Sequence, residues 1–335
     1  MLFLYIFFII VLFLCGVGFS QDDNYLSKER CNSIKGIFIL MIFLTHSLQY
    51  LKASGYVFSG IDTITSAIIR FTGQLVVVMF LFYSGYGVAV QIKTKGKEYV
   101  RQMPRRRILK TLLNFDIAVC FFILLDVMIS RPLSLSQVLL SFVAWDSVGN
   151  SNWYIFVIIL CYTLTYLANE INNRNVWVII LLFCTISVFV LSYVKESWWY
   201  DTLLVYPAGY FFACYRHRIE PILKRYYVPI LLVVICFFIV THGYGPYLRG
   251  LNPNIMAISF ALIVVMITMK VRIGNPVLQW FGINLFPLYI YQRLPMIALQ
   301  NYLGESFVSH NALFYLLSCL LITCVIAWSY KYWSI

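Results

Sequence analysis

The sequence predicts an all-α protein that crosses a membrane about eleven times. Hydrophobic residues make up 61% of its 335 residues, charged residues make up 11%, and the mean hydropathy is +0.83. A soluble protein of this composition would leave a large apolar surface in water, so lipid must cover much of it. The apolar residues form blocks of about 15 to 22, the length a helix needs to cross the hydrocarbon. They lack the alternation of membrane β-strands.

Eleven apolar blocks justify the predicted number of spans. They lie near residues 2–19, 34–51, 71–91, 108–129, 153–168, 176–194, 202–215, 227–241, 254–269, 276–299 and 311–329. The first block has no Lys or Arg before its apolar run, which favours a retained span over a cleaved signal peptide. We expect residues 1–33 to form an additional N-terminal transmembrane helix with a cytoplasmic linker, and residues 34–335 to form the main transmembrane domain.

Positive charge is concentrated on alternate connections between these blocks. The net charge is +12, and no soluble basic domain is present that would bind nucleic acid. If the spans alternate, most Lys and Arg residues share one side with the C-terminus, in the segments 20–33, 91–110, 169–175, 216–226 and 270–275. The positive-inside rule makes this side cytoplasmic and the N-terminus external, in the plasma (inner) membrane. The loops are short, so an active site must lie between helices.

His46 lies well inside the second predicted span, where a polar side chain is costly and is a candidate for function. Lys35 precedes it by eleven positions, almost three helical turns, so both lie on one face about 16 Å apart along the axis. A cation at the cytoplasmic edge would then stand in line with a deeper imidazole that can carry a proton. The structural alternative is a snorkelling lysine and a histidine hydrogen-bonded between helices.

The third predicted span ends in small residues and leads into a basic loop. Ser84 and Gly85 permit close contact between helices or close approach of the backbone to a ligand. The arginines of the loop match phosphate with paired donors, although such clusters also set topology and bind anionic lipid. They are Arg101, Arg105, Arg106 and Arg107.

Asp116 and Asp126 lie within the fourth predicted span. Either could orient an imidazole, neutralise an arginine, or pack helices through hydrogen bonds. No pattern indicates a metal site, a phosphate-binding glycine loop or a nucleophile elbow, so we expect no metal and no cofactor.

Together these segments resemble the membrane-bound acyltransferase 3 family. Lys35 and His46 match its basic residue and histidine in an early span, with Lys where many members have Arg. The Ser-Gly-aromatic sequence at 84–86 and the four arginines match its next elements. Trp153 matches an aromatic entry to a helix, and Tyr289 lies in a late tyrosine segment that ends at Gln292, where many members have histidine.

This resemblance implies a core of ten helices that transfers acyl groups, usually acetyl, from cytoplasmic acyl-CoA to a glycan hydroxyl. The acceptor would be a cell-surface glycan, such as O-antigen, capsule or exopolysaccharide, or its lipid-linked precursor. His46 would act as a general base or form an acyl-histidine. Lys35 and the four arginines would bind acyl-CoA. The residues that would bind or orient substrate are Ser84, Asp116, Asp126, Trp153, Tyr289 and Gln292.

Two other functions fit a polytopic membrane protein. A glycosyl-transfer or polymerase enzyme for lipid-linked sugars would commonly have a sizeable outer loop, and none is visible. A transporter or flippase could use His46, Asp116 and Asp126 as a proton relay. Transporters often show two related halves, and the sequence shows no such symmetry.

Overall fold

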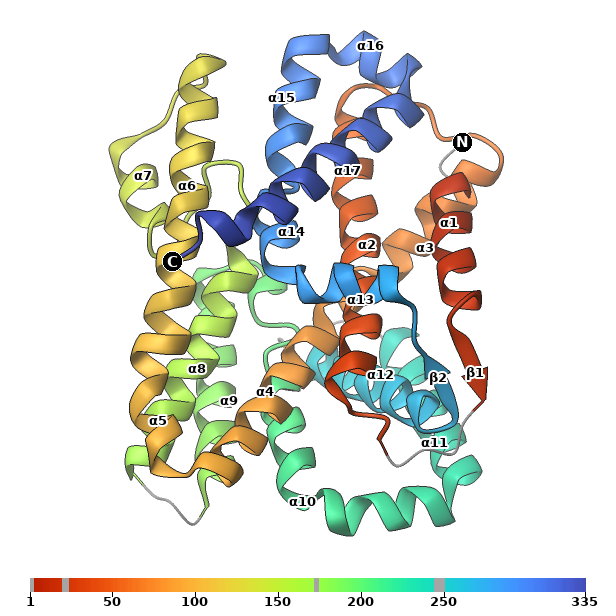
Figure 1. Ribbon diagram of the computed structural model, residues 1–335, viewed down its shortest axis with the longest axis vertical. Coiled ribbons are helices and arrows are strands. Elements are labelled where there is room, and N and C mark those ends of the chain that lie inside the picture. Colours follow the sequence, from red (N-terminus) through yellow and green to blue (C-terminus); the bar gives the residue numbers. More distant parts are fainter. Residues whose placement is uncertain (1–2, 20–23, 172–174, 244–250) are drawn as a thin grey trace.

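The computed structural model describes residues 3–19, 24–171, 175–243 and 251–335. Within these residues the chain is helical except for loops and one two-stranded sheet, so the predicted all-α class is confirmed apart from that sheet (Figure 1). The elements are α1 (Phe3–Leu14), β1 (Val17–Phe19), α2 (Lys28–Ala53), α3 (Ile61–Thr72), α4 (Leu75–Lys95), α5 (Lys97–Met103), η1 (Pro104–Leu109), α6 (Lys110–Met128), α7 (Leu135–Ser141), α8 (Trp153–Ile171), α9 (Val176–Val194), η2 (Ser197–Trp199), α10 (Val205–Arg225), α11 (Tyr227–Gly243), α12 (Leu251–Lys270), β2 (Val271–Ile273), α13 (Pro276–Ile283), α14 (Leu285–Tyr291), α15 (Arg293–Leu303), α16 (Glu305–His310), α17 (Ala312–Ser329) and η3 (Tyr330–Tyr332).

The described residues contain seven helical stretches that are long and apolar enough to cross a membrane. The count becomes eight if α10 and α11, which are bent by 100° relative to each other, form one broken span. The protein is therefore a multi-pass membrane protein, but the predicted number of eleven spans is not confirmed.

The difference arises where an apolar block is not one continuous helix. The predicted span 276–299 divides into α13, α14 and the beginning of α15, with a break at Asn284. The predicted span 2–19 becomes the 12-residue helix α1 followed by strand β1. Mean hydropathy measures the composition of a block and does not detect such breaks.

Helix α11 exposes most of its apolar side chains. Thr241 is the one buried residue among the described residues of α11, whereas large apolar side chains such as Leu232, Val233 and Phe237 are exposed. A water-soluble protein rarely exposes apolar surface of this extent, because contact of such surface with water is unfavourable. The exposed face of α11 is therefore suited to contact with lipid.

The N-terminal segment is joined to the rest of the chain by the small sheet. Strands β1 and β2 are antiparallel, with Val17 opposite Ile273 and Phe19 opposite Val271. Helix α1 also packs against α2, where the Tyr5 hydroxyl donates a hydrogen bond to the Leu40 carbonyl oxygen at 3.2 Å. The sheet places the end of α1 beside the 270–275 segment, which lies on the predicted cytoplasmic side.

Two helix crossings depend on glycine. At the crossing of α2 and α13, a Cβ atom on Gly36 would collide with the Leu278 backbone, and one on Gly282 would collide with the Asn32 backbone. The crossing of α4 and α10 uses Gly85 in the same manner. Of the two roles open to Gly85 in the sequence, the structure therefore shows close contact between helices.

We expect Gly85→Ala to destabilise the folded protein by about 1–3 kcal/mol, the usual cost of overpacking. Its new methyl group would meet the Tyr206 carbonyl oxygen. Gly87→Ala is the matched control two residues further along α4, because no atom of another described segment lies within 4 Å of the corresponding Cβ position. Thermal unfolding of both variants in detergent would measure the difference. Equal unfolding temperatures would contradict the packing role of Gly85.

Candidate functional site

His46 borders a cavity of about 490 Å³, which we name the His46 cavity. Ile42 and Gln49 line the same cavity, because residues three and four positions apart share one face of α2. The Nδ1 atom of His46 is buried and has no hydrogen-bond partner in the described part of the chain. A buried ring nitrogen without a partner is unfavourable, so this atom is a candidate to bond a water molecule or a ligand.

Other residues that line the His46 cavity also carry buried polar atoms that are unpaired among the described residues. They are Gln74 Oε1, Asn150 Nδ2, Ser151 Oγ and the Tyr289 hydroxyl. Buried polar groups in folded proteins nearly always have a hydrogen-bond partner, so several unpaired groups around one space need water or a ligand there. The His46 cavity is therefore suited to a molecule that carries several hydroxyl groups.

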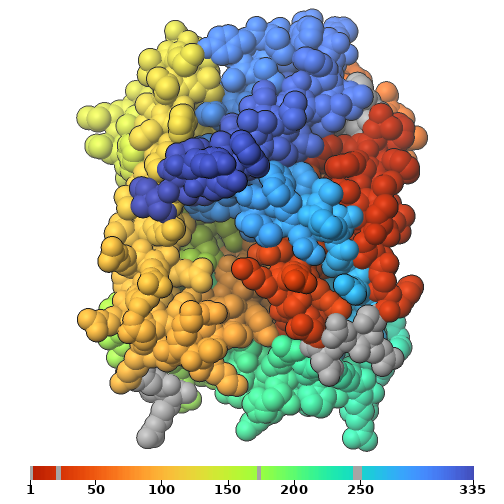
Figure 2. All heavy atoms as spheres, in the orientation of Figure 1, coloured from red at the N-terminus to blue at the C-terminus, as the bar shows by residue number. Residues whose placement is uncertain are grey.

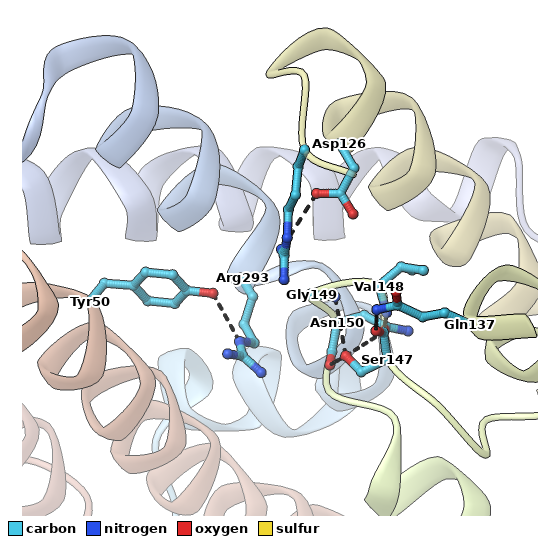
Figure 3. A network of polar contacts seen from close by, with 9 residues as sticks. Tyr50, Asp126, Gln137, Ser147, Val148, Gly149, Asn150 and Arg293 are labelled. Atoms are coloured by element: carbon cyan, nitrogen blue, oxygen red, sulfur yellow. Dashed lines mark hydrogen bonds and ion pairs between the residues drawn. The ribbon is translucent and has the colours of Figure 1, made fainter. Parts of the chain in front are cut away.

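A tight loop holds part of this polar wall in place. The Ser147 hydroxyl donates to the Asn150 carbonyl oxygen at 2.8 Å, and the Val148 amide donates to Asn150 Oδ1 at 3.1 Å (Figure 3). Gly149, between them, has φ = +94°, a conformation that side-chain-bearing residues rarely adopt. The loop fixes the oxygen atoms of Asn150, whose Nδ2 atom has no hydrogen-bond partner among the described residues.

Two indole rings complete the His46 cavity. Trp153 begins α8, and Trp198 lies in η2, so the rings come from different segments of the chain. Aromatic rings present large apolar faces, and the amide side chains between them present donors and acceptors. This combination matches a sugar, which has apolar C–H faces and polar hydroxyl edges.

A second cavity, of about 410 Å³, extends inward from the basic segment, and we name it the Arg107 cavity. Its lining comes from α4, η1, α6, α8, the end of α13, α14 and the C-terminal η3. In the space-filling view, a hollow lies among the orange, light-blue and dark-blue segments, with the green atoms of α8 at its floor (Figure 2). The polar lining residues are Ser84, Arg106, Arg107, Lys110, Thr111, Asn114, Tyr154, Tyr162, Asn284, Tyr289 and Tyr330.

The arginines reach this cavity from a π-helical turn, η1. Pro104 begins η1 and has no backbone N–H, so the normal helical hydrogen-bond pattern is interrupted there. Arg107 Nε donates to the Tyr99 hydroxyl at 3.1 Å. Arg106, Arg107 and Lys110 also line a surface hollow of about 660 Å³. These three cations therefore stand between the surface and the Arg107 cavity, where an incoming phosphate would meet them.

The two cavities meet at Tyr289, which lines both of them. The Tyr289 ring packs against Tyr154, with centroids 5.3 Å apart and an interplanar angle of 62°. Helix α4 runs past both spaces, since Val77 lines the His46 cavity and Ser84 lines the Arg107 cavity. Tyr289 is thus shared by a basic cavity and by a cavity lined by His46, whose Nδ1 atom is unpaired among the described residues.

The structure brings the predicted site residues into two groups. His46, Trp153 and Tyr289 line the His46 cavity, and Ser84, Arg106, Arg107 and again Tyr289 line the Arg107 cavity.

Three predicted acyl-CoA residues lie outside both cavities. Lys35 shares the helix of His46, as predicted, but lines neither cavity. Arg105 is exposed, and Arg101 lines a separate surface hollow with Tyr166.

The predicted acidic residues and Gln292 are also absent from the lining of the His46 cavity. Asp126 Oδ1 is 3.5 Å from Arg131 Nη1, so this carboxylate neutralises an arginine, one of the roles open to it in the sequence. Asp116 is absent from both cavity linings. Gln292 Nε2 donates to the Tyr289 carbonyl oxygen at 3.1 Å, and Gln292 thereby supports the backbone of a residue that lines both cavities.

Some residues that line the site were missed by the sequence reasoning. Arg293 lies within the predicted span 276–299, and a charge inside an apolar block is a signal that could have identified it. Lys110 contributed to the prediction only as one of the basic residues of segment 91–110, which indicate the cytoplasmic side. Nothing in the local sequence identified Trp198, because η2 approaches the cavity through tertiary structure.

This arrangement defines a multi-pass membrane protein with two polar cavities that converge between apolar helices. The model of the acyltransferase 3 family, described as an acyltransferase domain, matches residues 30–331. The chain belongs to this family, as the resemblance predicted, and is a membrane acyltransferase. No curated protein and no solved structure matches the chain significantly.

Proposed function

We propose that the protein transfers acetyl from cytoplasmic acetyl-CoA to a hydroxyl group of a cell-surface glycan or of its lipid-linked precursor. The observation that carries this proposal is the meeting of the two cavities at Tyr289. One cavity has cations suited to a phosphate-bearing donor. The other has a polar wall suited to a sugar and a histidine whose Nδ1 atom is unpaired in the described part of the chain. The family membership supports acyl transfer as the reaction.

The donor would enter through the Arg107 cavity. Arg106, Arg107 and Lys110 would hold the CoA phosphates at the mouth, because guanidinium and ammonium groups form strong hydrogen bonds with phosphate oxygens. The narrow thioester arm would extend past Ser84 toward Tyr289. The acyl carbon would then reach the boundary with the His46 cavity.

The acceptor hydroxyl would bind in the His46 cavity. As general base, a neutral His46 takes the hydroxyl proton while the sugar oxygen attacks the thioester carbonyl carbon. The new C–O bond forms, the C–S bond breaks, and the imidazolium returns the proton to the CoA sulfur. In the alternative with an acyl-histidine, the imidazole nitrogen attacks first and the sugar oxygen attacks second. Both routes give an O-acyl sugar and free CoA.

A proton-relay transporter finds no support in the geometry. The relay would need Asp116 and Asp126 near His46, but Asp126 pairs with Arg131 and Asp116 is absent from the lining of the His46 cavity.

The experiment that tests the proposed reaction uses the purified protein in liposomes. Acetyl-CoA labelled in the acetyl group is supplied outside the vesicles together with glycans extracted from envelopes of cells that lack the gene. We expect base-labile label on the glycan and stoichiometric release of CoA thiol. Accumulation of unmodified substrate inside the vesicles, without acylation, would instead indicate transport and overturn the proposal.

We also propose that the basic face is cytoplasmic, with the N-terminus outside and the C-terminus inside the plasma (inner) membrane. On a background without reactive native cysteines, Thr94→Cys should resist an impermeant thiol reagent in intact cells. Thr94 is exposed near the end of α4, among the basic residues. Ser136→Cys, exposed in α7 on the opposite side, should react. The reverse labelling pattern would overturn this topology and the assigned side of donor entry.

A further inference from the structure

Arg293 connects the site to a third cavity. It is the first residue of α15 and lines the His46 cavity. It also lines a cavity of about 480 Å³ that we name the Arg131 cavity. Arg293 Nε donates to the Tyr50 hydroxyl at 3.1 Å, and its guanidinium lies over the Tyr50 ring at 5.5 Å from the centroid. Tyr50 thus fixes one edge of the guanidinium, which extends from α15 into the space between Tyr50 and the loop of Asn150 (Figure 3).

The charge of Arg293 is not compensated in the described part of the chain. No carboxylate there lies within ion-pair distance of its guanidinium. Arg131, the other cation that lines the Arg131 cavity, is paired with Asp126, and Glu305 on the same cavity is exposed. A guanidinium has five N–H donors, and the structure gives one of them a partner here.

A half-buried cation without a paired carboxylate among the described residues is unfavourable unless something offsets its charge. The planar fork of donors in a guanidinium matches carboxylate and phosphate groups. The surrounding wall has the unpaired donors and acceptors of Asn150, Ser151 and Gln74, of which Asn150 and Ser151 are almost fully buried. An anion bound at Arg293 therefore belongs to a molecule that also has hydroxyl groups.

We propose that the acceptor is an acidic glycan, whose carboxylate or phosphate binds Arg293 while the hydroxyl to be acylated faces His46. This assignment rests on the proposed function, which it narrows to one class of acceptor. The two indoles of the His46 cavity hold the sugar ring, and the Arg131 cavity receives the continuing chain of the glycan. Arg293 is a specificity-determining residue in this arrangement.

A binding experiment that needs no turnover tests the assignment. The purified protein in detergent is titrated with glucuronate, glucose 1-phosphate or glucose at constant ionic strength, and dissociation constants come from the dependence of the unfolding temperature on concentration. We expect the wild type to bind at least one of the acidic sugars about tenfold more tightly than glucose, from one charged hydrogen-bonded pair. Preference for glucuronate identifies a carboxylate, and preference for glucose 1-phosphate identifies a phosphate.

Variants show whether Arg293 is the source of this preference. Arg293→Gln should bring the ratio of dissociation constants close to one without weakening the binding of glucose. His46→Gln should keep the preference, because it removes no charge from the anion site. Lys52→Gln removes an exposed positive charge near the end of α2, outside these cavities, and should also keep it.

Equal affinities of the wild type for glucose and both acidic sugars would overturn the proposal, as would an unchanged preference in Arg293→Gln. Since this assay does not depend on acyl transfer, acylation of glycans in liposomes combined with equal affinities would remove the acidic acceptor and leave the proposed reaction standing. Preference for acidic sugars without any acyl transfer would support the acidic ligand and overturn the proposed reaction.

Discussion

Replacement of His46 by Gln is expected to lower turnover by about 10² to 10⁴, the usual contribution of general acid–base catalysis. Glutamine keeps a hydrogen-bonding side chain at the cavity wall but cannot accept the proton of an attacking hydroxyl group. His46 Nδ1 has no partner among the described residues, so no hydrogen bond of that atom within this part of the protein is lost. The measurement is the initial rate of acetyl transfer in liposomes at saturating donor.

The control for this variant is His310→Gln. His310 is exposed in α16 and lies outside the cavities of the proposed site, so turnover should remain near that of the wild type. Both variants should reach the membrane in folded form, with unfolding temperatures close to the wild type. If His46→Gln kept a large share of wild-type turnover, the imidazole would not be the catalytic base, and the assignment of this cavity to the chemical step would have to be abandoned.

Neutralising Arg106 and Arg107 together as Gln is expected to raise the KM for acetyl-CoA roughly 10- to 100-fold. A hydrogen bond between charged groups contributes about 1.5–3 kcal/mol, so the loss of one such bond corresponds to a rise of about this size. Both side chains line the Arg107 cavity and the surface hollow at its mouth. The KM for the glycan should change little, because neither arginine lines the His46 cavity.

A matched variant separates phosphate binding from general loss of positive charge. Lys93→Gln combined with Arg218→Gln removes the same charge from exposed positions on the same face, outside the Arg107 cavity. Its KM for acetyl-CoA should stay within a few fold of the wild type at physiological salt, where exposed charges are screened over about 8 Å. An equal rise in KM in both double variants would show that the arginines act through the overall field and do not bind the donor directly.

The sequence was sufficient to predict the class of the protein and the position of His46 on a long apolar helix. The prediction that Lys35 and His46 share one helix is correct because α2 is continuous over Lys28–Ala53. The structure does not bring Lys35 to the same cavity as His46: Lys35 lines neither cavity, and its neighbour Gly36 packs against α13. Helical periodicity gives the direction of a side chain but not which neighbouring helix covers it.

Local sequence patterns could not predict which distant segments of the chain come together around the cavities. Tyr289 and Trp153 entered the prediction through family resemblance, and no spacing rule places them around His46. Arg293 was overlooked because the block 276–299 was interpreted as a continuous span, whereas the structure begins a new helix at this residue. Its position between two cavities depends on how α14 and α15 pack against α2.

The pairing of β1 with β2 determines the order in which the chain can be assembled. Val17 lies opposite Ile273, a partner synthesised roughly 250 residues later, which takes about 10–50 s at ordinary rates of translation. During that interval α1 can reach α2, which follows it directly, but β1 has no strand to join. The sheet of β1 and β2 must therefore form late, after α12 has emerged from the ribosome. A pulse-labelled chain with one cysteine at Val17 and another at Ile273 should form a crosslink only near the end of synthesis.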